Sequence, residues 1–592
     1  MRAVGRTPVT LTRRPELTTR RSAGLIRTLA LAALGLGALG GVQAAESSGP
    51  CPLPPPASLV VDPPEIRSVH GLLQADLSIY GYRASDGRDH YCYRSADGQM
   101  APTLRVHPGD RVELRLTNRL TRTDSDGATP VAHAHHHSAQ QQDDPCTRAA
   151  MTPLATNLHF HGLNLPPVCH QDEVLRTAVL PQDPPFEYRF TVPPDEPPGL
   201  YWYHPHIHGY TNRQVTGGAS GALIVEGIER AIPEVAGLPE RVFVLRDPTL
   251  SHPDAPPSKA EPVVPAPVLD PDGEVANNNT GFGKPARDLS INFVPVPYPD
   301  YPPAQIRMRP GERQLWRVVN AASLTYVHLA LLYDHVPQNF GVVAIDGVPV
   351  NVGSAAAPRV KVVDHLAIPP GSRAEFIMQG PQAGQSALLI TRMVDTGQDG
   401  ENDPNRPLAA IQAATDARDP PHLPPRGRPL PAGRLPWVGD VQPVRTRHLY
   451  FSERRSDPAN PNSPTLFFLT EEGHEPRVFD PAAGPDIVVR QGTVEDWVIE
   501  NRSLELHDFH IHQLHFQLRE WYGIEVDEEF LRDTVSVPFF DNHMTKYPSV
   551  RVRMDFRDRA TVGTFLYHCH LLEHEDGGMM GEIRVDPAGG SP

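Results

Sequence analysis

The chain has 592 residues, with 54 Lys and Arg against 70 Asp and Glu, so its formal net charge is −16 at pH 7. This negative charge disfavours nucleic acid and anionic membranes as partners, whereas it is compatible with cationic substrates or metal ions. Proline is abundant, with 67 residues that concentrate near 248–310 and 403–437, which is typical of long connections between domains.

The first 45 residues have the form of an export signal. Arginines up to Arg27 precede an apolar run from Leu29 to Leu39, and Val42-Gln43-Ala44 is a small-residue cleavage pattern. The apolar run is too short to span a membrane. Arg20-Arg21 permits the twin-arginine route, and an ordinary secretory signal is the alternative. We therefore expect a periplasmic or secreted protein, without membrane insertion, whose mature net charge is about −22.

A pattern of strand, glycine turn and strand occurs three times. It runs from Leu104 to Asn118, from Ile306 to Asn320 and from Ile487 to Asn501, and in each copy a Gly precedes the Asn by nine positions. Alternating apolar and polar residues predict a strand on each side of the turn. Copies that recur after 202 and 181 residues are too far apart for a solenoid and indicate domains. We predict an all-β protein with three consecutive β-sandwich domains, at residues 46–235, 236–440 (including proline-rich connections) and 441–592.

Histidines occur in four short groups, two in the first predicted domain and two in the third. The groups are His159-Phe160-His161, Tyr203-His204-Pro205-His206, His507-Asp508-Phe509-His510-Ile511-His512 and Tyr567-His568-Cys569-His570. Side chains alternate between the two faces of a strand. His568 and His570 therefore share one face while Cys569 points to the other, so this strand can serve two metal sites. By the same parity, His510 and His512 lie opposite His507.

The last group continues to His574 and Met579, and thus combines a thiolate, a thioether and imidazoles. This mixture of ligands selects copper and is typical of a blue electron-transfer site. The residues on the opposite face, His507 and Cys569, would form that site with His574 and Met579. Eight imidazoles remain, enough for three more copper ions between the first and third domains: His159, His161, His204, His206, His510, His512, His568 and His570.

The four groups resemble the four copper signatures of the multicopper oxidases, the family of laccases, bilirubin oxidases and periplasmic cuprous oxidases. The resemblance covers nearly the whole chain after residue 45, and its His-Cys-His segment is highly specific. It implies three cupredoxin-like Greek-key β-sandwich domains. It also implies four copper ions, of which one is type 1, one is type 2 and two are type 3.

The resemblance assigns a ligand to each copper. His507, Cys569 and His574 match the type 1 ligands, with Met579 axial. His159 and His510 match the type 2 ligands. The type 3 pair is matched by His161, His204, His206, His512, His568 and His570. Gln513 departs from the small or apolar residue that many members have there, and it should not change the number of coppers.

Reduction of O2 to water consumes protons, and acids beside the cluster are their natural source. Glu575, directly after His574, matches the proton-relay glutamate of the family. Asp172, in the run His170-Gln171-Asp172-Glu173 after the first signature, matches the acid near the type 2 copper. We therefore predict catalytic roles in proton transfer for Glu575 and Asp172.

The resemblance implies an enzyme that takes single electrons from a donor at the type 1 copper and reduces O2 at the cluster. The leading hypothesis is a laccase-like oxidase of phenols or aromatic amines. The alternative is a cuprous or other metal-ion oxidase in copper tolerance, because residues 212–215 and 568–580 resemble the periplasmic cuprous oxidases. Those enzymes usually carry a methionine-rich insertion, whereas the ten methionines here are scattered.

A hypothesis of another class is a non-enzymatic copper-binding envelope protein. Family members of that kind have typically lost ligands, and this chain has not. We expect a monomer whose partners are O2 and a small-molecule or metal-ion electron donor.

Four cysteines remain once Cys569 is assigned to copper, and all lie in the first predicted domain. An even number in an oxidising compartment indicates two disulfides, with three connectivities. We favour Cys51 with Cys92 and Cys146 with Cys169. Three further histidine positions are interpreted as structural: the polar loop with His133 to His137, His208 after the second signature, and His515 after the third.

Overall fold

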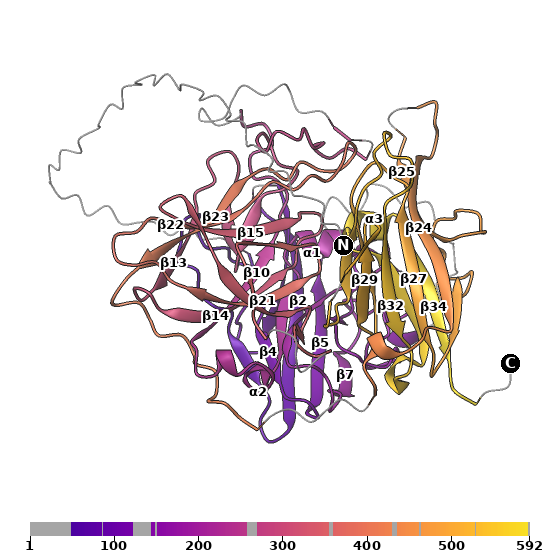
Figure 1. The fold of residues 1–592 in the computed structure, drawn as a ribbon, viewed down its shortest axis with the longest axis horizontal. Coiled ribbons are helices and arrows are strands. Elements are labelled where there is room, and N and C mark those ends of the chain that lie inside the picture. Colours follow the sequence, from indigo (N-terminus) through magenta and orange to yellow (C-terminus); the bar gives the residue numbers. More distant parts are fainter. Residues whose placement is uncertain are drawn as a thin grey trace, which may run out of the picture. The chain divides into compact units, whose positions relative to one another are not determined.

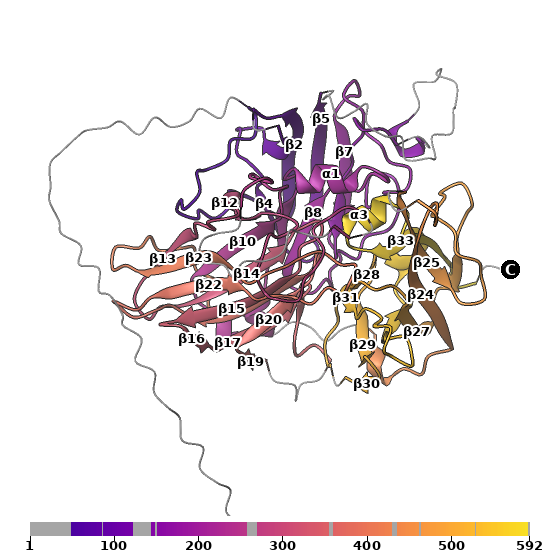
Figure 2. The same cartoon turned by 90° about the horizontal axis from the view of Figure 1, so that it is seen from above.

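The computed structural model describes residues 49–589 except 86, 122–143, 149–150, 257–268, 271, 354–358, 429–434, 461–462 and 527. The predicted export signal and the loop with His133 to His137 lie outside the described residues. Strands dominate the described chain and form three consecutive pairs of sheets, as Figures 1 and 2 show. The prediction of an all-β fold is therefore confirmed. The boundaries near residues 235 and 440 stay predictions.

The first pair combines a five-stranded sheet, β1-β4-β9-β8-β6, with a four-stranded sheet, β3-β2-β5-β7. Both histidine groups of the first predicted domain lie at one side of the five-stranded sheet, on β6 and at the end of β8. The strands are β1 (Glu65–Arg67), β2 (Leu72–Arg83), β3 (Asp89–Ser95), β4 (Thr103–Val106), β5 (Arg111–Leu120), β6 (His159–His161), β7 (Phe186–Thr191), β8 (Gly199–His204) and β9 (Gly221–Val225).

The second pair combines the sheet β12-β11-β10-β14-β21-β17-β18, to which β19 adds at β17, with the sheet β13-β23-β22-β15-β16, to which β20 adds at β15. Trp316 of β14 lies fully buried in the core between them. The strands are β10 (Glu240–Arg246), β11 (Leu289–Ile291), β12 (Val294–Val296), β13 (Ala304–Met308), β14 (Arg313–Asn320), β15 (Val327–Tyr333), β16 (Val336–Gln338), β17 (Phe340–Ile345), β18 (Val348–Pro349), β19 (Lys361–Val363), β20 (His365–Ile368), β21 (Arg373–Gln379), β22 (Ala387–Thr391) and β23 (Arg406–Ala413).

The third pair combines a six-stranded sheet, β25-β24-β27-β32-β29-β30, with a five-stranded sheet, β26-β34-β33-β28-β31. The two histidine groups of this part lie on β28 and β33, which are neighbours. The strands are β24 (Arg445–Arg455), β25 (Thr465–Glu471), β26 (Ile487–Arg490), β27 (Val494–Asn501), β28 (His507–Ile511), β29 (Phe516–Trp521), β30 (Ile524–Glu525), β31 (Thr534–Val537), β32 (Ser549–Asp555), β33 (Gly563–Cys569) and β34 (Met580–Asp586).

Each strand–glycine–strand repeat carries the chain from one sheet of its pair to the other. The two strands of each repeat belong to different sheets, namely β4 and β5 in the first, β13 and β14 in the second, and β26 and β27 in the third. The turning residues Gly109, Gly311 and Gly492 have φ of +90°, +67° and +93°. Only glycine adopts this conformation without strain, so the repeated glycine makes the same crossing in each pair.

The asparagine that ends each repeat fixes two loops. Nδ2 of Asn118, Asn320 and Asn501 each donates to two backbone carbonyls. For Asn501 these carbonyls belong to Glu505 and Val537, at 2.7 and 3.2 Å. The third repeat therefore holds the loop that leads directly into β28 and its first histidine.

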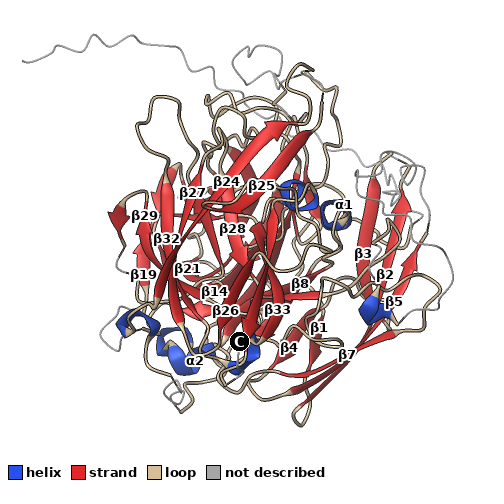
Figure 3. Cartoon of the chain, turned by 90° about the vertical axis from the view of Figure 1, so that its right-hand side faces the viewer, coloured by secondary structure: helices blue, strands red, loops and turns tan. Residues whose placement is uncertain are grey.

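Helices are few and short beside the strands (Figure 3). Asp576 in α3 accepts from the backbone N–H groups of Thr211, at 3.0 Å, and Asn212, at 2.9 Å, at the start of α1. This contact joins the segments that follow the second and fourth histidine groups. No described helix has the length and apolar character that crossing a membrane requires. The helices are α1 (Thr211–Thr216), α2 (Ile228–Ala231), α3 (Leu572–Asp576), and the 3₁₀ turns η2 (Pro145–Thr147), η3 (Pro233–Val235), η4 (Val438–Asp440) and η5 (Arg559–Thr561).

Two disulfides tie the first sheet pair together. Cys51 is bonded to Cys92 and Cys146 to Cys169, with sequence separations of 41 and 23 residues. The connectivity favoured from the sequence is confirmed. Cys569 is the one free cysteine of the chain, and it is buried.

Replacing Cys51 and Cys92 together by alanine should destabilise the first sheet pair by about 3–4 kcal/mol, because the unfolded chain regains the entropy of a 41-residue loop. The measurement is the unfolding midpoint of the first transition under oxidising conditions. An unchanged midpoint would mean that Pro50 and Cys51 are already fixed by their hydrogen bonds from Arg94 and Tyr82.

Candidate metal centres

Two strands and a helix bring three of the predicted ligands together. His507 opens β28, Cys569 ends the neighbouring β33, and His574 lies in α3. Cys569 Sγ is 3.6 Å from His507 Nδ1 and 3.9 Å from His574 Nδ1, and the two Nδ1 atoms are 3.2 Å apart. All three side chains are fully buried. Three donor atoms this close can hold one metal ion.

Met579 is folded back against this group by two backbone hydrogen bonds. Its N–H donates to the carbonyl of His574 at 2.8 Å, and its carbonyl accepts from the N–H of Cys569 at 3.0 Å. The Met579 side chain is fully buried in the same apolar cluster as Cys569. Its position is therefore compatible with the axial role that the sequence predicts.

The outer nitrogens of the two imidazoles face polar groups. His507 Nε2 lies 2.8 Å from both Ser503 Oγ and Glu453 Oε1, and His574 Nε2 lies 3.1 Å from Glu505 Oε1 but has no hydrogen-bond partner among the described residues. The contacts of His507 help to turn its Nδ1 toward Cys569. Burial lowers the pKa of His574 to about 4, so its ring is neutral and can bind a metal.

The other eight predicted ligands form one buried cluster from two sheets. In the first sheet pair, β6 and β8 place His159 opposite His204, and in the third, β28 and β33 place His510 opposite His568. The imidazoles of the two sheets interleave. His159 stacks on His512 with ring centroids 3.9 Å apart, and His161 stacks on His510 at 4.0 Å.

Several sets of donor atoms lie close enough for a metal ion within this cluster. His568 Nε2 is 3.4 Å from His206 Nε2 and 3.2 Å from His512 Nε2. The ring of His570 lies 5.0 Å from that of His161. Donor atoms of His159, His161 and His204, and of His159, His510 and His512, also converge. The eight imidazoles therefore suit several metal ions side by side.

The buried ring nitrogens show that a metal fits. Buried polar atoms normally have a hydrogen-bond partner. Burial also lowers the pKa of most of these histidines well below the usual range, which leaves the rings neutral with a free lone pair. In the described part of the chain, no hydrogen-bond partner exists for His159 Nε2, His161 Nδ1, His204 Nε2, His510 Nε2, His512 Nδ1 and both ring nitrogens of His570.

Comparisons with known proteins agree with this geometry. Three family models, each described as multicopper oxidase, match residues 149–230, 256–413 and 458–589, which together exceed half of the chain. The chain belongs to the multicopper oxidase family. It is thus a copper-dependent oxidoreductase that uses O2, and its neighbours share the cupredoxin-like β-sandwich fold.

The similar proteins are distant in sequence. A laccase from Bacillus subtilis (strain 168) is 22% identical over 520 residues, which cover 82% of this chain and 88% of that protein. The solved multicopper oxidase from Campylobacter jejuni, titled a metallo-oxidase, has a TM-score of 0.61 at 22% identity and covers 90% of this chain and 96% of that chain. The McoA multicopper oxidase from Aquifex aeolicus has a TM-score of 0.60 at 18% identity. The match covers 90% of this chain and 99% of that chain.

Asp172 lies directly beside His159. Its carboxylate is 3.0 Å from His159 Nδ1 and accepts from the N–H of Phe160 at 2.9 Å. Gln513, the departure from the family pattern, donates from Nε2 to Asp172 Oδ2 at 2.5 Å. The glutamine thus fixes the acid that orients His159.

Asp533 is a functional residue that sequence reasoning missed. It lies 3.1 Å from His161 Nε2, and its backbone carbonyl is 2.8 Å from His510 Nδ1. Arg373, from β21 of the second sheet pair, donates to both Asp533 oxygens at 2.8 and 2.7 Å. No local motif marks either residue, because their pairing joins segments 160 residues apart.

Gly371 of the second sheet pair lies against the ring of His570. Its φ is +85°, and a Cβ there would come within 2.9 Å of the His570 ring. Beside it, Trp202 stacks on His204 at 4.1 Å and donates from Nε1 to the carbonyl of Gly371 at 3.1 Å. The second sheet pair therefore contacts the cluster directly.

Glu575 lies in α3 with one oxygen 3.6 Å from His206 Nε2 and the other 3.6 Å from His568 Nδ1. Its side chain is fully buried, and burial raises its pKa well above the usual range. Burial therefore favours the protonated form of this carboxyl, which lies next to two imidazoles of the cluster.

The remaining histidines lie outside the donor sets. His208 packs edge-on against Phe479, with centroids 5.4 Å apart. His515 is buried with Nε2 3.1 Å from the carbonyl of Asp346 and 3.6 Å from Asp533 Oδ2. His515 thus contacts Asp533, the acid beside His161.

Buried carboxylates surround the outer side of the Cys569 donor set, and sequence reasoning missed them as well. Besides Glu505, His574 Nε2 has Asp272 Oδ2 at 3.7 Å. Burial raises the pKa of Asp270, which contacts Asp272, to about 8. We call these acids the carboxylate cluster: Asp270, Asp272, Glu401, Glu453 and Glu505.

The carboxylate cluster reaches the surface through partly exposed acids. The side chains of Asp272 and Glu453 are 10% and 13% exposed. Beyond them, Arg287 pairs with Glu274 at 3.0 Å and with Glu573 at 3.5 Å. Atoms Oδ2 of Asp270, Oδ1 of Asp272 and Oε1 of Glu505 have no hydrogen-bond partner among the described residues.

Replacing Asp533 by Asn should lower the copper affinity of the histidine cluster about 10–100-fold, because the residue that orients a metal ligand loses its charge. The measurement is copper retained during dialysis against a graded chelator. Asp364→Asn is the control, since that side chain is 57% exposed and pairs with His365, which is not one of the predicted ligands. Equal retention in both variants would show that Asp533 does not orient His161.

Proposed function

We propose that the chain is an oxidase in which four copper ions couple one-electron oxidation of a donor to four-electron reduction of O2 to water. The observation that carries this proposal is the complete set of predicted ligands with unpartnered buried ring nitrogens. The type 1 ligands would be His507, Cys569, His574 and Met579. The type 2 ligands would be His159 and His510, and the type 3 ligands His161, His204, His206, His512, His568 and His570.

The chain itself connects the two donor sets. Cys569 belongs to one set, while His568 and His570 on either side belong to the other, so three consecutive residues link them. His507 and His510 provide a second link along β28. Short covalent paths of this kind keep the two sets at a fixed separation, which supports electron transfer between them.

Glu575 and Asp172 are proposed to supply protons to the cluster. Glu575 contacts two imidazoles and can hold a proton at neutral pH, as a general acid must. Asp172 contacts a third imidazole and is held by Gln513. Glu575 is the stronger candidate, because Asp172 also has the separate task of orienting His159.

A metal cation is the donor that the carboxylate cluster favours. Five acids crowd the outer face of His507 and His574, which is where a donor would deliver electrons to the type 1 ligands. Burial and mutual repulsion raise the pKa of Asp270, Glu401 and Glu505, and a bound cation would relieve that repulsion, whereas a phenolate anion would add to it. Oxygen ligands suit divalent ions such as ferrous or manganous ion, whereas cuprous ion prefers sulfur. The alternative predicted from the sequence, a metal-ion oxidase, is therefore our leading proposal, and its donor would be divalent.

A laccase-like oxidase of phenols or aromatic amines is the second candidate. Similarity to the Bacillus subtilis laccase is the observation that favours it. Aromatic amines would meet less repulsion than phenolates at the same acids. The two disulfides support an exported location for either enzyme.

Oxygen uptake by copper-loaded protein tests the proposal. Ferrous ion, manganous ion, cuprous ion and a phenol are compared as donors, with Cys569→Ser as the inactive control. Turnover only with the phenol would replace the metal-ion proposal by the laccase-like one. Turnover that persists in Cys569→Ser would overturn the type 1 assignment.

The double variant Asp270→Asn/Asp272→Asn should raise KM for the divalent donor at least about tenfold, since a lost charged contact costs about 1.5 kcal/mol or more. Turnover of the phenol should stay within about twofold of the parent protein. The control is Asp416→Asn, which removes one charge from a side chain that is 77% exposed. If KM for the divalent donor does not change, the cation binds elsewhere.

Glu575→Gln should lower kcat with a phenolic donor by about 100-fold or more, because a positioned general acid contributes at least that factor. The blue absorption should remain. Glu573→Gln is the matched control on the same helix, since its side chain is 31% exposed and pairs with Arg287. Loss of copper in Glu575→Gln would instead indicate a structural role.

A further inference from the structure

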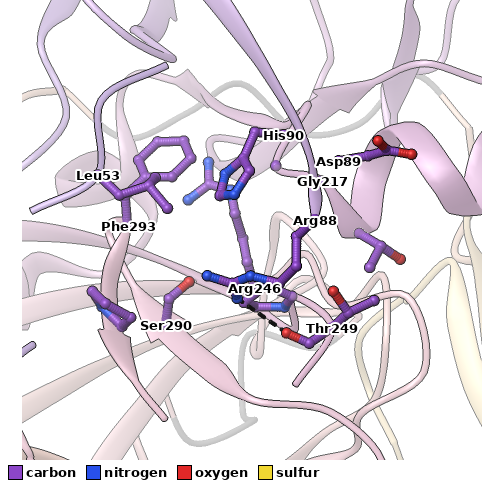
Figure 4. Close-up of a pocket in the computed structure, with 13 residues that line it drawn as sticks. Leu53, Arg88, Asp89, His90, Gly217, Arg246, Thr249, Ser290 and Phe293 are labelled. Carbon is purple, nitrogen blue, oxygen red and sulfur yellow. Dashed lines mark hydrogen bonds between the residues drawn. The ribbon is translucent and has the colours of Figure 1, made fainter. Parts of the chain in front are cut away.

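A small cavity lies between the first and second sheet pairs, away from the histidines. Its volume is about 40 Å³, room for two or three waters or one small ion. Figure 4 shows its lining, which includes Arg88 and His90 from the first pair and Arg246, Ser290 and Phe293 from the second. None of these residues takes part in the proposed oxidase.

Arg246, at the end of β10, is the central group of this cavity. It is 3% exposed, and its guanidinium carbon lies 3.8 Å from the centroid of the Phe293 ring. Nε donates to Ser220 Oγ and Nη2 to the Ser220 carbonyl, both at 2.8 Å. Nη1 is buried and has no acceptor in the described part of the chain. Nη1 of Arg246 is thus a strong hydrogen-bond donor at the cavity that has no acceptor among the described residues.

No carboxylate of the described residues forms an ion pair with Arg246. Asp89 is the acid among the lining residues, and it is turned away to Arg83, at 3.1 Å, and Arg213, at 3.2 Å (Figure 4). Asp247, the next residue in the chain, accepts from the N–H groups of Ser323, Leu324 and Thr325.

Asp288, directly before the neighbouring strand β11, also has other hydrogen-bond partners. It accepts from the N–H groups of Ser251 and Tyr298. Burial without a counter-charge lowers the pKa of Arg246 to about 9. The guanidinium therefore stays charged at neutral pH, and the described lining residues offer it no carboxylate.

Arg88 brings a second guanidinium to the same cavity. It donates from Nη1 to the carbonyl of Thr249 at 3.1 Å, which fixes the side chain across the lining (Figure 4). Two guanidinium groups line the same cavity, so both would attract an anion placed there. A buried donor without an acceptor also costs free energy, which an anion would remove.

We propose that this cavity binds one small inorganic anion of the size of chloride or nitrate, held by Arg246 Nη1 together with Arg88. Arg88 belongs to the first sheet pair and Arg246 to the second. The anion therefore acts as a clamp between the two pairs and stabilises their contact. This site is independent of the copper chemistry.

The test is thermal unfolding of the copper-loaded protein at constant ionic strength, with gluconate exchanged stepwise for chloride. The parent protein should show a saturable rise of about 1–3 °C in Tm, because a ligand that binds only the folded state stabilises it. The rise should be lost in Arg88→Gln and in Arg246→Met. The control Arg111→Gln should keep it, since that side chain is 60% exposed on β5.

Arg246→Met also loses the hydrogen bonds to Ser220, so the Tm of this variant in gluconate should be lower than that of the parent protein. The comparison between proteins therefore uses only the rise in Tm from gluconate to chloride. A rise that persists in Arg88→Gln and Arg246→Met would place the chloride effect elsewhere and overturn the proposal. A parent protein without a saturable rise would overturn it as well. In crystals soaked in bromide, an anomalous peak within hydrogen-bond distance of Arg246 Nη1 should appear, and its absence would refute the site.

Discussion

The contact on which the whole structure depends is the interleaving of imidazoles from two sheets that are more than 300 residues apart in the chain. His159 stacks on His512 and His161 on His510, at 3.9 and 4.0 Å. The donor atoms of both sheets can meet only if the first and third sheet pairs dock within a few tenths of an ångström. Eight buried imidazoles, six of which carry a ring nitrogen without a hydrogen-bond partner among the described residues, disfavour that docking when no metal is bound. Copper binding and the docking of the sheet pairs are therefore coupled, and each stabilises the other.

The second sheet pair makes this docking possible although it carries no predicted ligand. Arg373 reaches from β21 to Asp533, whose carboxylate contacts His161 and whose carbonyl contacts His510. A fully buried ion pair is a poor source of net stability, because desolvation offsets most of the attraction. Breaking it is costly, however, and its planar two-bond geometry fixes position and angle. The pair therefore specifies where the third sheet pair sits rather than adding much to stability.

The local parts of this arrangement can be predicted from the sequence, whereas the contacts between distant segments cannot. Strand alternation, the Gly-to-Asn spacing and the parity of His507, Cys569 and His568 are properties of a few consecutive residues, so the pattern predicts them. Asp533, Arg373 and Asp272 act only through partners far along the chain, and an isolated acid or arginine has no local signature. The sequence shows Gln513 as an exception to the family pattern, but only the structure shows its hydrogen bond to Asp172. The proline-rich segment 248–310 looked like a connection, and it also supplies Asp270 and Asp272 to the carboxylate cluster.

The two faces of β28 and β33 explain why the donor class depends on residues outside the copper signatures. Side chains that point inward from these strands join the cluster of eight histidines, and those that point outward form the donor set with Cys569. The inner face is closed by the first sheet pair, whereas the outer face is covered by loops of the second pair and by β24. Those loops are free to vary without disturbing any ligand. In this chain they bring carboxylates to the outer nitrogens of His507 and His574, so the surface that meets the donor is acidic while the copper ligands keep the family pattern.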